Sequence, residues 1–199
     1  KIINEYQEKY PEIILLESHE NHGVSYSRNR ALEKAKGEYV WFVDGDDKVE
    51  AYVVPSLIQK MRDYDLDILQ VGYKDISPNG IVSESYLHLP ESKVMTGRDL
   101  YLSKQLCMAP WAFIYRKSLL TDNNISFPED FKTCEDIQFN QKALFFAKKA
   151  MTTSAFGYYY RLRISSATQG QAHRVMIDHV RRLPLAVEYF KPLGANDFL

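Results

Sequence analysis

The feature that most constrains this chain is an apolar run that ends directly in a cluster of acids. Residues 39–43 are all apolar, and the next four are Asp44-Gly45-Asp46-Asp47. A short run of β-branched and aromatic residues predicts a strand covered on both faces, as in a parallel sheet. Open α/β sheets bind ligands at the carboxyl ends of such strands. The sequence therefore predicts an acidic site at one edge of an α/β sheet.

The segments around this strand alternate between strand and helix patterns. We expect strands at residues 13–16 and 67–73, and a helix at 55–65 that begins with Pro55. A further helix is expected at 25–36, ended by Gly37 in a left-handed conformation. This alternation predicts an α/β fold with a mostly parallel sheet flanked by helices.

The second half of the chain is less regular but still contains recognisable elements. The expected elements are a helix at 96–106, a strand at 111–115, a helix at 135–150, a strand at 156–163 and a helix at 175–189 interrupted by Pro184. With no linker or repeat in the sequence, residues 1–199 are expected to form one domain. Within it, 1–76 would form a donor-side half, 77–170 an acceptor-side half, and 171–199 a helical tail.

Composition excludes several classes of function. The 25 basic and 26 acidic residues nearly balance, which argues against a general nucleic-acid coat. No apolar run approaches the roughly 18 residues of a membrane span, so any membrane association would be peripheral. Cys107 and Cys134 are too few for a disulfide framework or a four-thiolate zinc site, and we interpret both as reduced cytosolic thiols.

Carboxylate oxygens in this arrangement are suited to Mg²⁺ or Mn²⁺, which take few protein ligands because substrate phosphates complete the coordination shell. Without a cation, three crowded negative charges would repel one another. The alternative is structural: Asp46 or Asp47 could cap the following helix, and Asp44 could be a turn residue. The short motif alone does not decide between them.

The preceding residues give the motif its context. Residues 21–31 (NHGVSYSRNRA) and 37–47 (GEYVWFVDGDD) together resemble the central block of family 2 glycosyltransferases, with Ser27 in place of the usual Ala. The resemblance implies a GT-A fold and a nucleotide-sugar donor, most simply a UDP-sugar. It also implies that Asp44 contacts the nucleotide, that Asp46 binds the divalent cation and that Asp47 orients this shell.

Arg28 lies in the same block, on the expected helix. A guanidinium there could pair with a phosphate or a base carbonyl. Considered by itself, however, Arg28 would be interpreted as an ordinary surface arginine. The strands that hold the nucleoside in this family have no counterpart before residue 21, so the sequence is expected to be N-terminally incomplete.

A second acidic pair, Glu135-Asp136, begins the expected helix 135–150. Thr133 followed three residues later by an acid is a capping-box pattern, so a structural role is one interpretation. The segment also resembles the family's Glu-Asp motif, whose Asp is the catalytic base in inverting members. The resemblance thus implies that Asp136 is the base and places Glu135 on the acceptor side.

Two further candidates come from aromatic segments. The run from Tyr158 to Arg161 resembles a family segment in which a Tyr or Arg approaches the diphosphate, although a strand edge explains the tyrosines more simply. Arg161 is accordingly a candidate donor-binding residue. Trp111 is a candidate platform for the acceptor sugar, but a Trp in an apolar run more often belongs to the core.

These features predict an inverting, metal-dependent glycosyltransferase that moves a sugar from a nucleotide-sugar donor to a glycan or lipid-linked acceptor. The resemblance suggests bacterial surface-polysaccharide synthesis, in the cytoplasm at the inner face of the membrane. The alternative is a non-catalytic module that binds a glycan or a protein on the same scaffold. A nucleotidyltransferase or phosphohydrolase is disfavoured because the chain lacks a P-loop.

Overall fold

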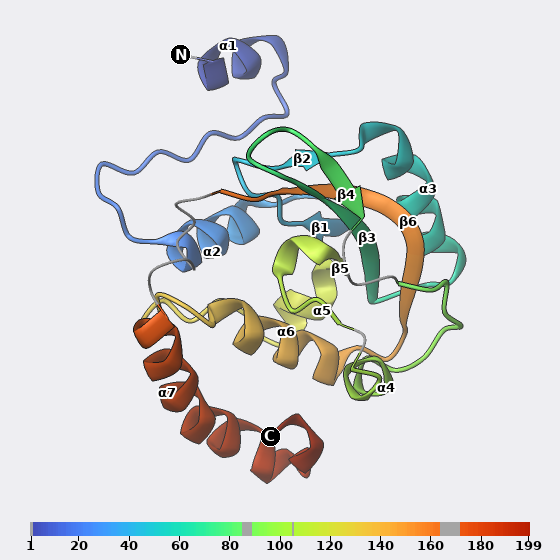
Figure 1. The fold of residues 1–199 in the computed structure, drawn as a ribbon, viewed down its shortest axis with the longest axis vertical. Helices are drawn as coiled ribbons and strands as arrows, with labels where there is room; N and C mark the ends of the chain where they lie inside the picture. The colour runs from blue at the N-terminus through green and yellow to red at the C-terminus, as the bar shows by residue number, and fades with distance from the viewer. Residues whose placement is uncertain (1, 85–88, 105, 164–171) are drawn as a thin grey trace.

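The computed structural model describes residues 2–84, 89–104, 106–163 and 172–199 (Figure 1). Its helices are α1 (Ile2–Lys9), α2 (Val24–Lys34), α3 (Val54–Asp63), α4 (Gly97–Leu102), α5 (Lys117–Asp122), α6 (Glu135–Phe146) and α7 (Ala172–Phe190). Its strands are β1 (Tyr39–Trp41), β2 (Lys48–Val49), β3 (Ile68–Ile76), β4 (Val82–Glu84), β5 (Phe113–Arg116) and β6 (Ala150–Arg161).

The strands form one sheet in the order β1-β5-β3-β6-β2, and β4 pairs with β3. Among the described strands, only β3 and β6 pair in parallel; the other pairs are antiparallel. The expectation of a mostly parallel sheet is therefore wrong. An apolar strand covered on both faces has the same composition in either direction, and the connections between strands decide which direction it takes.

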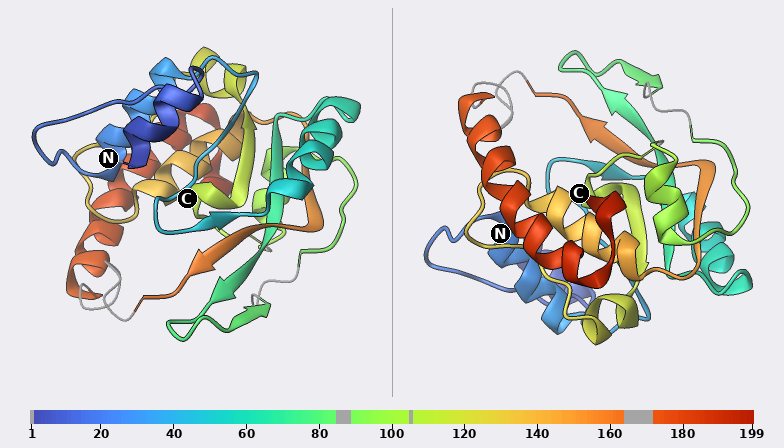
Figure 2. Two further views of the ribbon diagram at one scale, coloured as in Figure 1. Left: turned by 90° about the horizontal axis from the view of Figure 1, so that it is seen from above. Right: turned by 90° about the horizontal axis from the view of Figure 1, so that it is seen from below.

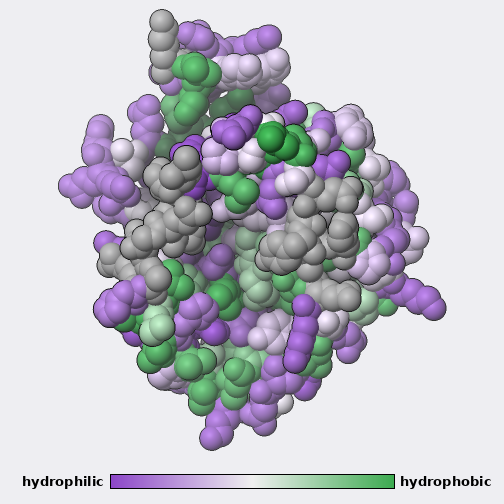
Figure 3. All heavy atoms as spheres, in the orientation of Figure 1, coloured by the Kyte–Doolittle hydropathy of each residue, from purple (hydrophilic) through white to green (hydrophobic). Residues whose placement is uncertain are grey.

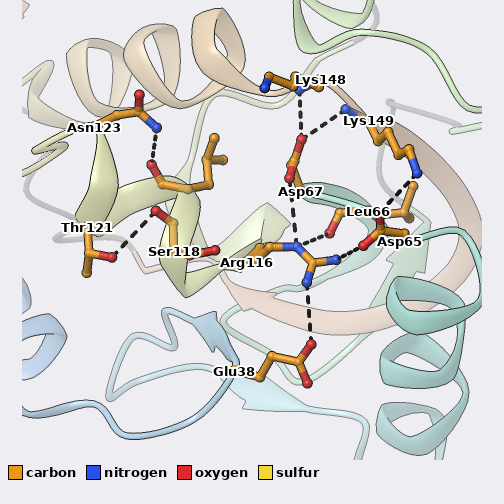
Figure 4. A network of polar contacts seen from close by, with 11 residues as sticks. Glu38, Asp65, Leu66, Asp67, Arg116, Ser118, Thr121, Asn123, Lys148 and Lys149 are labelled. Atoms are coloured by element: carbon orange, nitrogen blue, oxygen red, sulfur yellow. Dashed lines mark hydrogen bonds and ion pairs between the residues drawn. The ribbon is translucent and has the colours of Figure 1, made fainter.

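Three of the strands, β1, β3 and β6, nevertheless end at the same edge of the sheet. Because β1 and β3 are each antiparallel to β5, and β6 is parallel to β3, the strands β1, β3 and β6 all run the same way. Their carboxyl ends therefore lie at one edge, with Asp44 following β1. At the opposite edge, Arg116 contacts Glu38, Asp65 and the Leu66 carbonyl, and so ties the start of β3 to the end of β5 (Figure 4).

Helices cover both faces of the sheet (Figure 2). On one face, α3 buries Leu57 and Met61 against Leu69 and Val71 of β3. On the other face, α6 buries Phe139 in an aromatic cluster. The rings of Phe127 and Phe139 stack at 3.9 Å, and Phe42 meets both rings edge-on. This cluster fixes the start of α6 close to the residues that follow β1.

Helix α7 packs outside α6 and carries the chain to its C-terminus (Figure 2). Phe145 of α6 meets Phe190 at 5.6 Å and Phe198 at 5.5 Å. The outer side of α7 exposes Met176, Val180 and other apolar residues, and hydrophobic and polar side chains intermingle on the face shown in Figure 3. Within the described part of the chain, no helix has both the length and the apolar character to cross a membrane.

Several expected boundaries differ from the structure. Residues 13–16 form no strand, because no described strand pairs with them. Helix α6 ends at Phe146 instead of residue 150, since Asp67 accepts hydrogen bonds from the backbone N–H groups of Lys148 and Lys149 and so holds a turn before β6. The expected helix 96–106 ends at Leu102.

Two expectations about special residues are also wrong. Helix α2 ends at Lys34 with an extended Ala35 as its cap, and Gly37 does not adopt positive φ. Helix α7 continues through Pro184. Proline removes the hydrogen bond to the carbonyl of Val180, but both residues are exposed, so water can hydrate that carbonyl.

Candidate active site

Asp47 attaches the acidic loop, residues 44–47 after β1, to β6 by two hydrogen bonds. Its Oδ2 accepts a hydrogen bond from the Tyr158 hydroxyl at 2.7 Å, and its Oδ1 accepts one from the Arg161 backbone N–H at 2.8 Å. The Tyr158 hydroxyl in turn accepts a hydrogen bond from the Asp44 backbone N–H at 3.1 Å. Asp47 thus orients the loop, and both of its carboxylate oxygens are already occupied.

Asp46 lies on the more open side of the same loop. Its Oδ2 contacts Arg163 Nε at 3.0 Å, and its backbone carbonyl accepts a hydrogen bond from Arg161 Nε at 2.9 Å. Its other carboxylate oxygen has no partner among the described residues. Arg161, expected near the donor, is therefore placed directly beside the loop.

Arg28 connects the acidic loop to the start of α6. Its Nη2 lies 2.7 Å from Asp44 Oδ1, and its Nη1 lies 3.6 Å from Glu135 Oε1. The guanidinium also lies over the Phe127 ring at 5.3 Å from the ring centre. Because the Arg28 side chain is only 13% exposed, it is a partly buried bridge and not an ordinary surface arginine.

The start of α6 does not form the capping box that its sequence allowed. The N-cap is Cys134, in a left-handed conformation with φ of 64°, and it makes no side-chain cap. Thr133 instead donates a hydrogen bond to Asp178 Oδ2 of α7 at 2.8 Å. Asp136 is therefore not part of a capping box, and its Oδ1 accepts the Ile137 backbone N–H at 2.8 Å.

Burial and mutual repulsion raise the pKa values of the acids at this edge. Burial is the largest cause for Asp136, and the charge of Asp44 adds to it, while the Ile137 N–H and Arg28 oppose the shift. The pKa of Glu135 is raised by burial and by Asp136. The pKa of Asp47 is likewise raised, mainly by burial. Perturbed carboxylates that influence one another in this way are typical of functional sites.

The sequence also matches a known protein family. The model described as "Glycosyl transferase family 2" matches residues 1–122. The chain belongs to this family. The resemblance drawn from residues 21–47 is thereby confirmed.

Relatives of this family 2 chain include named glycosyltransferases. It is 32% identical over 139 residues to the poly(ribitol-phosphate) β-N-acetylglucosaminyltransferase TarS of Staphylococcus aureus, covering 69% of this chain and 23% of TarS. It is 30% identical over 173 residues to the uncharacterized glycosyltransferase EpsJ of Bacillus subtilis, covering 81% of this chain and 48% of EpsJ. The chain thus spans from a quarter to a half of these relatives.

Solved structures confirm the expected GT-A fold. The crystal structure of S. aureus TarS 1–349 with UDP-GlcNAc aligns with a TM-score of 0.70 and 28% identity, covering 85% of this chain and 49% of that one. The same fragment with UDP aligns with a TM-score of 0.68 and 25% identity, covering 96% of this chain and 61% of that one. The family 2 chain therefore shares the TarS architecture over most of its own length.

Aromatic residues of this family 2 chain form the wall next to the loop. Trp111 is 7% exposed, and its ring stacks on Tyr158 at 4.7 Å and on Tyr160 at 5.2 Å. Tyr73 meets it edge-on at 4.7 Å. This burial fits the core interpretation of Trp111 and leaves little open ring surface for a sugar.

Two contributors were not anticipated from the sequence. A strand edge is the simpler explanation of Tyr158 in the sequence. Its alternation with Tyr160, and the resemblance of the run from Tyr158 to Arg161 to a family segment near the diphosphate, are the signals that could have placed it at the loop. Asn29 was part of the recognised block without an assigned role. Its amide donates to the Phe127 carbonyl at 2.9 Å and accepts the Phe127 N–H at 2.8 Å, so it attaches α2 to the segment that leads into α6.

Proposed function

We propose that this chain carries the catalytic centre of an inverting glycosyltransferase that moves a sugar from a UDP-sugar to a glycan or lipid-linked acceptor. The observation that carries the proposal is the Arg28 bridge, which brings Asp44 of the donor-side loop and Glu135, next to Asp136, onto one guanidinium. TarS, a bacterial relative named as a poly(ribitol-phosphate) β-N-acetylglucosaminyltransferase, supports a role in bacterial surface-polysaccharide synthesis. Its complex with UDP-GlcNAc supports the donor class.

In this proposal Asp136 is the general base. It takes the proton of the acceptor hydroxyl while that oxygen bonds to the anomeric carbon, opposite the breaking bond to the diphosphate. The raised pKa of Asp136 makes it a better proton acceptor than an exposed aspartate. The Ile137 N–H and the nearby Arg28 favour its charged form, so the carboxylate is available to accept the proton.

Asp46 would hold the divalent cation. No group of three or more His, Cys, Asp or Glu side chains in the described ranges could hold a metal ion by itself. Mg²⁺ commonly binds through one or two carboxylates together with substrate phosphates, and Asp46 has a carboxylate oxygen to offer. A bound Mg²⁺ or Mn²⁺ would stabilise negative charge on the departing diphosphate. Asp44 and Arg161 would then face the nucleotide side of the donor.

The same arrangement divides the chain by role. We assign residues 1–76, which carry Arg28 and the acidic loop, to donor binding. Residues 77–170 carry Asp136 and would form the acceptor side, with 171–199 as a helical tail. The contact of Thr133 with Asp178 supports a tail that steadies the segment before the base.

The test is Asp136→Asn, with Asp122→Asn, an exposed acid at the end of α5, as the matched control. Loss of a general base lowers the transfer rate by roughly 10²- to 10⁴-fold. We expect kcat to fall by that amount while the Kd for the UDP-sugar stays within about twofold, and the control to keep full activity. Unchanged transfer would remove Asp136 as the base. A wild-type protein that binds no nucleotide sugar with Mg²⁺ or Mn²⁺, yet binds a glycan, would favour the non-catalytic alternative.

A further inference from the structure

Asp75 and Tyr160 lie side by side at the carboxyl ends of β3 and β6, the edge at which Asp44 follows β1, and the proposed chemistry uses neither. They are register partners in the parallel pair of β3 and β6, as are Tyr73 and Tyr158 just before them. Side chains of register partners project from the same face of a sheet. Tyr158 and Tyr160 both stack on Trp111, so Asp75 is on the face that carries this aromatic wall.

The carboxylate of Asp75 has no partner in the described part of the chain. It is half-buried, and burial raises its pKa. Lys74, its basic neighbour, instead lies over the Phe156 ring at 4.6 Å. A partly buried carboxylate without a hydrogen bond is unfavourable, so a ligand that donates hydrogen bonds would be bound readily there.

Electrostatic coupling connects Asp75 with Cys107 and with Tyr160. The pKa of the Cys107 thiol is raised to about 11, mainly by burial, and the charges of Asp136 and Asp75 both contribute. The pKa of Tyr160 is raised by burial and by the charges of the acidic loop and of Asp75. Asp75 is therefore within electrostatic range of the groups that border the candidate base and the donor loop.

We propose that Asp75 selects the acceptor by accepting hydrogen bonds from the hydroxyls of an uncharged sugar that lies against Tyr160, beside Asp136. This inference rests on the proposed function. A carboxylate binds two neighbouring hydroxyls well, and an aromatic side chain suits the apolar surface of a sugar.

The carboxylates of Asp75 and Asp136 favour an uncharged sugar over a phosphorylated one. Among the described residues, neither Asp75 nor Asp136 is in an ion pair. A phosphate on the acceptor unit would therefore approach two carboxylates with no cation paired to either, and like charges repel. The acceptor unit next to the base would thus differ from the phosphate-bearing polymer named for TarS.

The experiment compares Asp75→Asn, Asp75→Lys and the control Asp63→Asn, an exposed acid of α3 that bonds only Gln59 among the described residues. The probes are the methyl glycosides of glucose, galactose, mannose and N-acetylglucosamine, and their 6-phosphates. Transfer is measured for each, and binding without donor is followed by saturation-transfer NMR. Thermal unfolding confirms that each variant is folded.

We expect the wild type to prefer an uncharged glycoside over its 6-phosphate by at least tenfold in kcat/KM. Asp75→Asn should raise the acceptor KM about tenfold and leave kcat and the donor KM within twofold. Asp75→Lys should shift the preference toward the 6-phosphate. An unchanged acceptor KM in Asp75→Asn, or a wild-type preference for the 6-phosphate, would overturn the assignment.

The binding measurement separates this inference from the proposed function. If the wild type neither transfers a sugar nor binds a UDP-sugar, the proposed function fails. Glycoside binding that is lost in Asp75→Asn would still support the subsite. Glycoside binding that is equal in the wild type and Asp75→Asn would refute it whatever the activity.

Discussion

Replacement of Arg28 by Ala tests whether one guanidinium holds the acidic loop and the start of α6 together. The change removes the contact with Asp44 at 2.7 Å, the longer contact with Glu135 at 3.6 Å and the cation–π contact with Phe127. It also leaves Asp44 near Glu135 and Asp136, whose pKa values its charge already raises. We therefore expect a loss of stability together with a further rise in the pKa of Asp136.

The magnitude follows from the burial of the pair. A hydrogen bond to a charged group contributes about 1.5–3 kcal/mol, and a cation–π contact about 0.5–1 kcal/mol at an exposed site. Because Asp44 is 32% exposed on its side chain, solvent stabilises it partly after the loss, and the lower part of each range applies. The free energy of unfolding should fall by about 2–3 kcal/mol.

Urea unfolding of the wild type, Arg28→Ala and Arg28→Lys measures this loss, with Lys expected to retain part of it because it keeps the charge but loses the fork geometry. A double-mutant cycle with Asp44→Asn isolates the pair, and its coupling energy should exceed about 1 kcal/mol. A loss below about 0.5 kcal/mol in Arg28→Ala, in the range of an ordinary surface substitution, would refute the bridge.

Three further changes have defined outcomes. Gly97→Ala would place a Cβ against the Leu144 carbonyl oxygen of α6, so overpacking should cost about 1–3 kcal/mol in urea unfolding; an unchanged midpoint would contradict the close packing of α4 on α6. Tyr158→Phe removes the hydrogen bond to Asp47, so it should raise the donor KM and lower the free energy of unfolding by about 1–3 kcal/mol. An unaltered donor KM would show that the acidic loop keeps its position without this hydrogen bond. The folded-state pKa of Asp136 is raised above its ordinary 3.8, so its contribution to stability is present at low pH and is lost as pH rises through the raised value. Asp136→Asn should therefore unfold with a flatter pH dependence, and a profile identical to wild type would argue against the shift. Stability should fall as pH rises through this interval, whereas the transfer rate should rise, because Asp136 acts as a base only in its charged form.

The acidic loop and the edge on which it lies could be predicted from the sequence because both depend on local order along the chain. An apolar strand followed by Asp44 must present that acid at its carboxyl end, whatever strand lies beside it. The direction of β5 could not be predicted, since burial on both faces determines its composition and not its orientation. The fold family was accessible only through the matched block in residues 21–47.

Side-chain partners far apart in sequence account for most of the other differences. Helix α6 ends at Phe146 because Asp67, about eighty residues earlier, accepts hydrogen bonds from the N–H groups of Lys148 and Lys149. Thr133 forms no local capping box because its hydroxyl donates a hydrogen bond to Asp178 of α7. In each case a side chain far away in the sequence makes the hydrogen bond that decides the local structure. A single sequence contains no direct signal of that pairing.

Adjacent residues on α2 explain how two acidic motifs so distant in sequence can act at one centre. Arg28 contacts Asp44 of the acidic loop and Glu135, while Asn29 fixes the backbone of Phe127. The Phe127 ring stacks on Phe139 of α6, so the same turn of α2 holds both the segment before α6 and α6 itself, which carries the proposed base Asp136. Displacement transfer requires donor and base to keep a near-attack geometry within fractions of an ångström. A single rigid helix that contacts both sides meets this requirement more directly than two independently placed loops would.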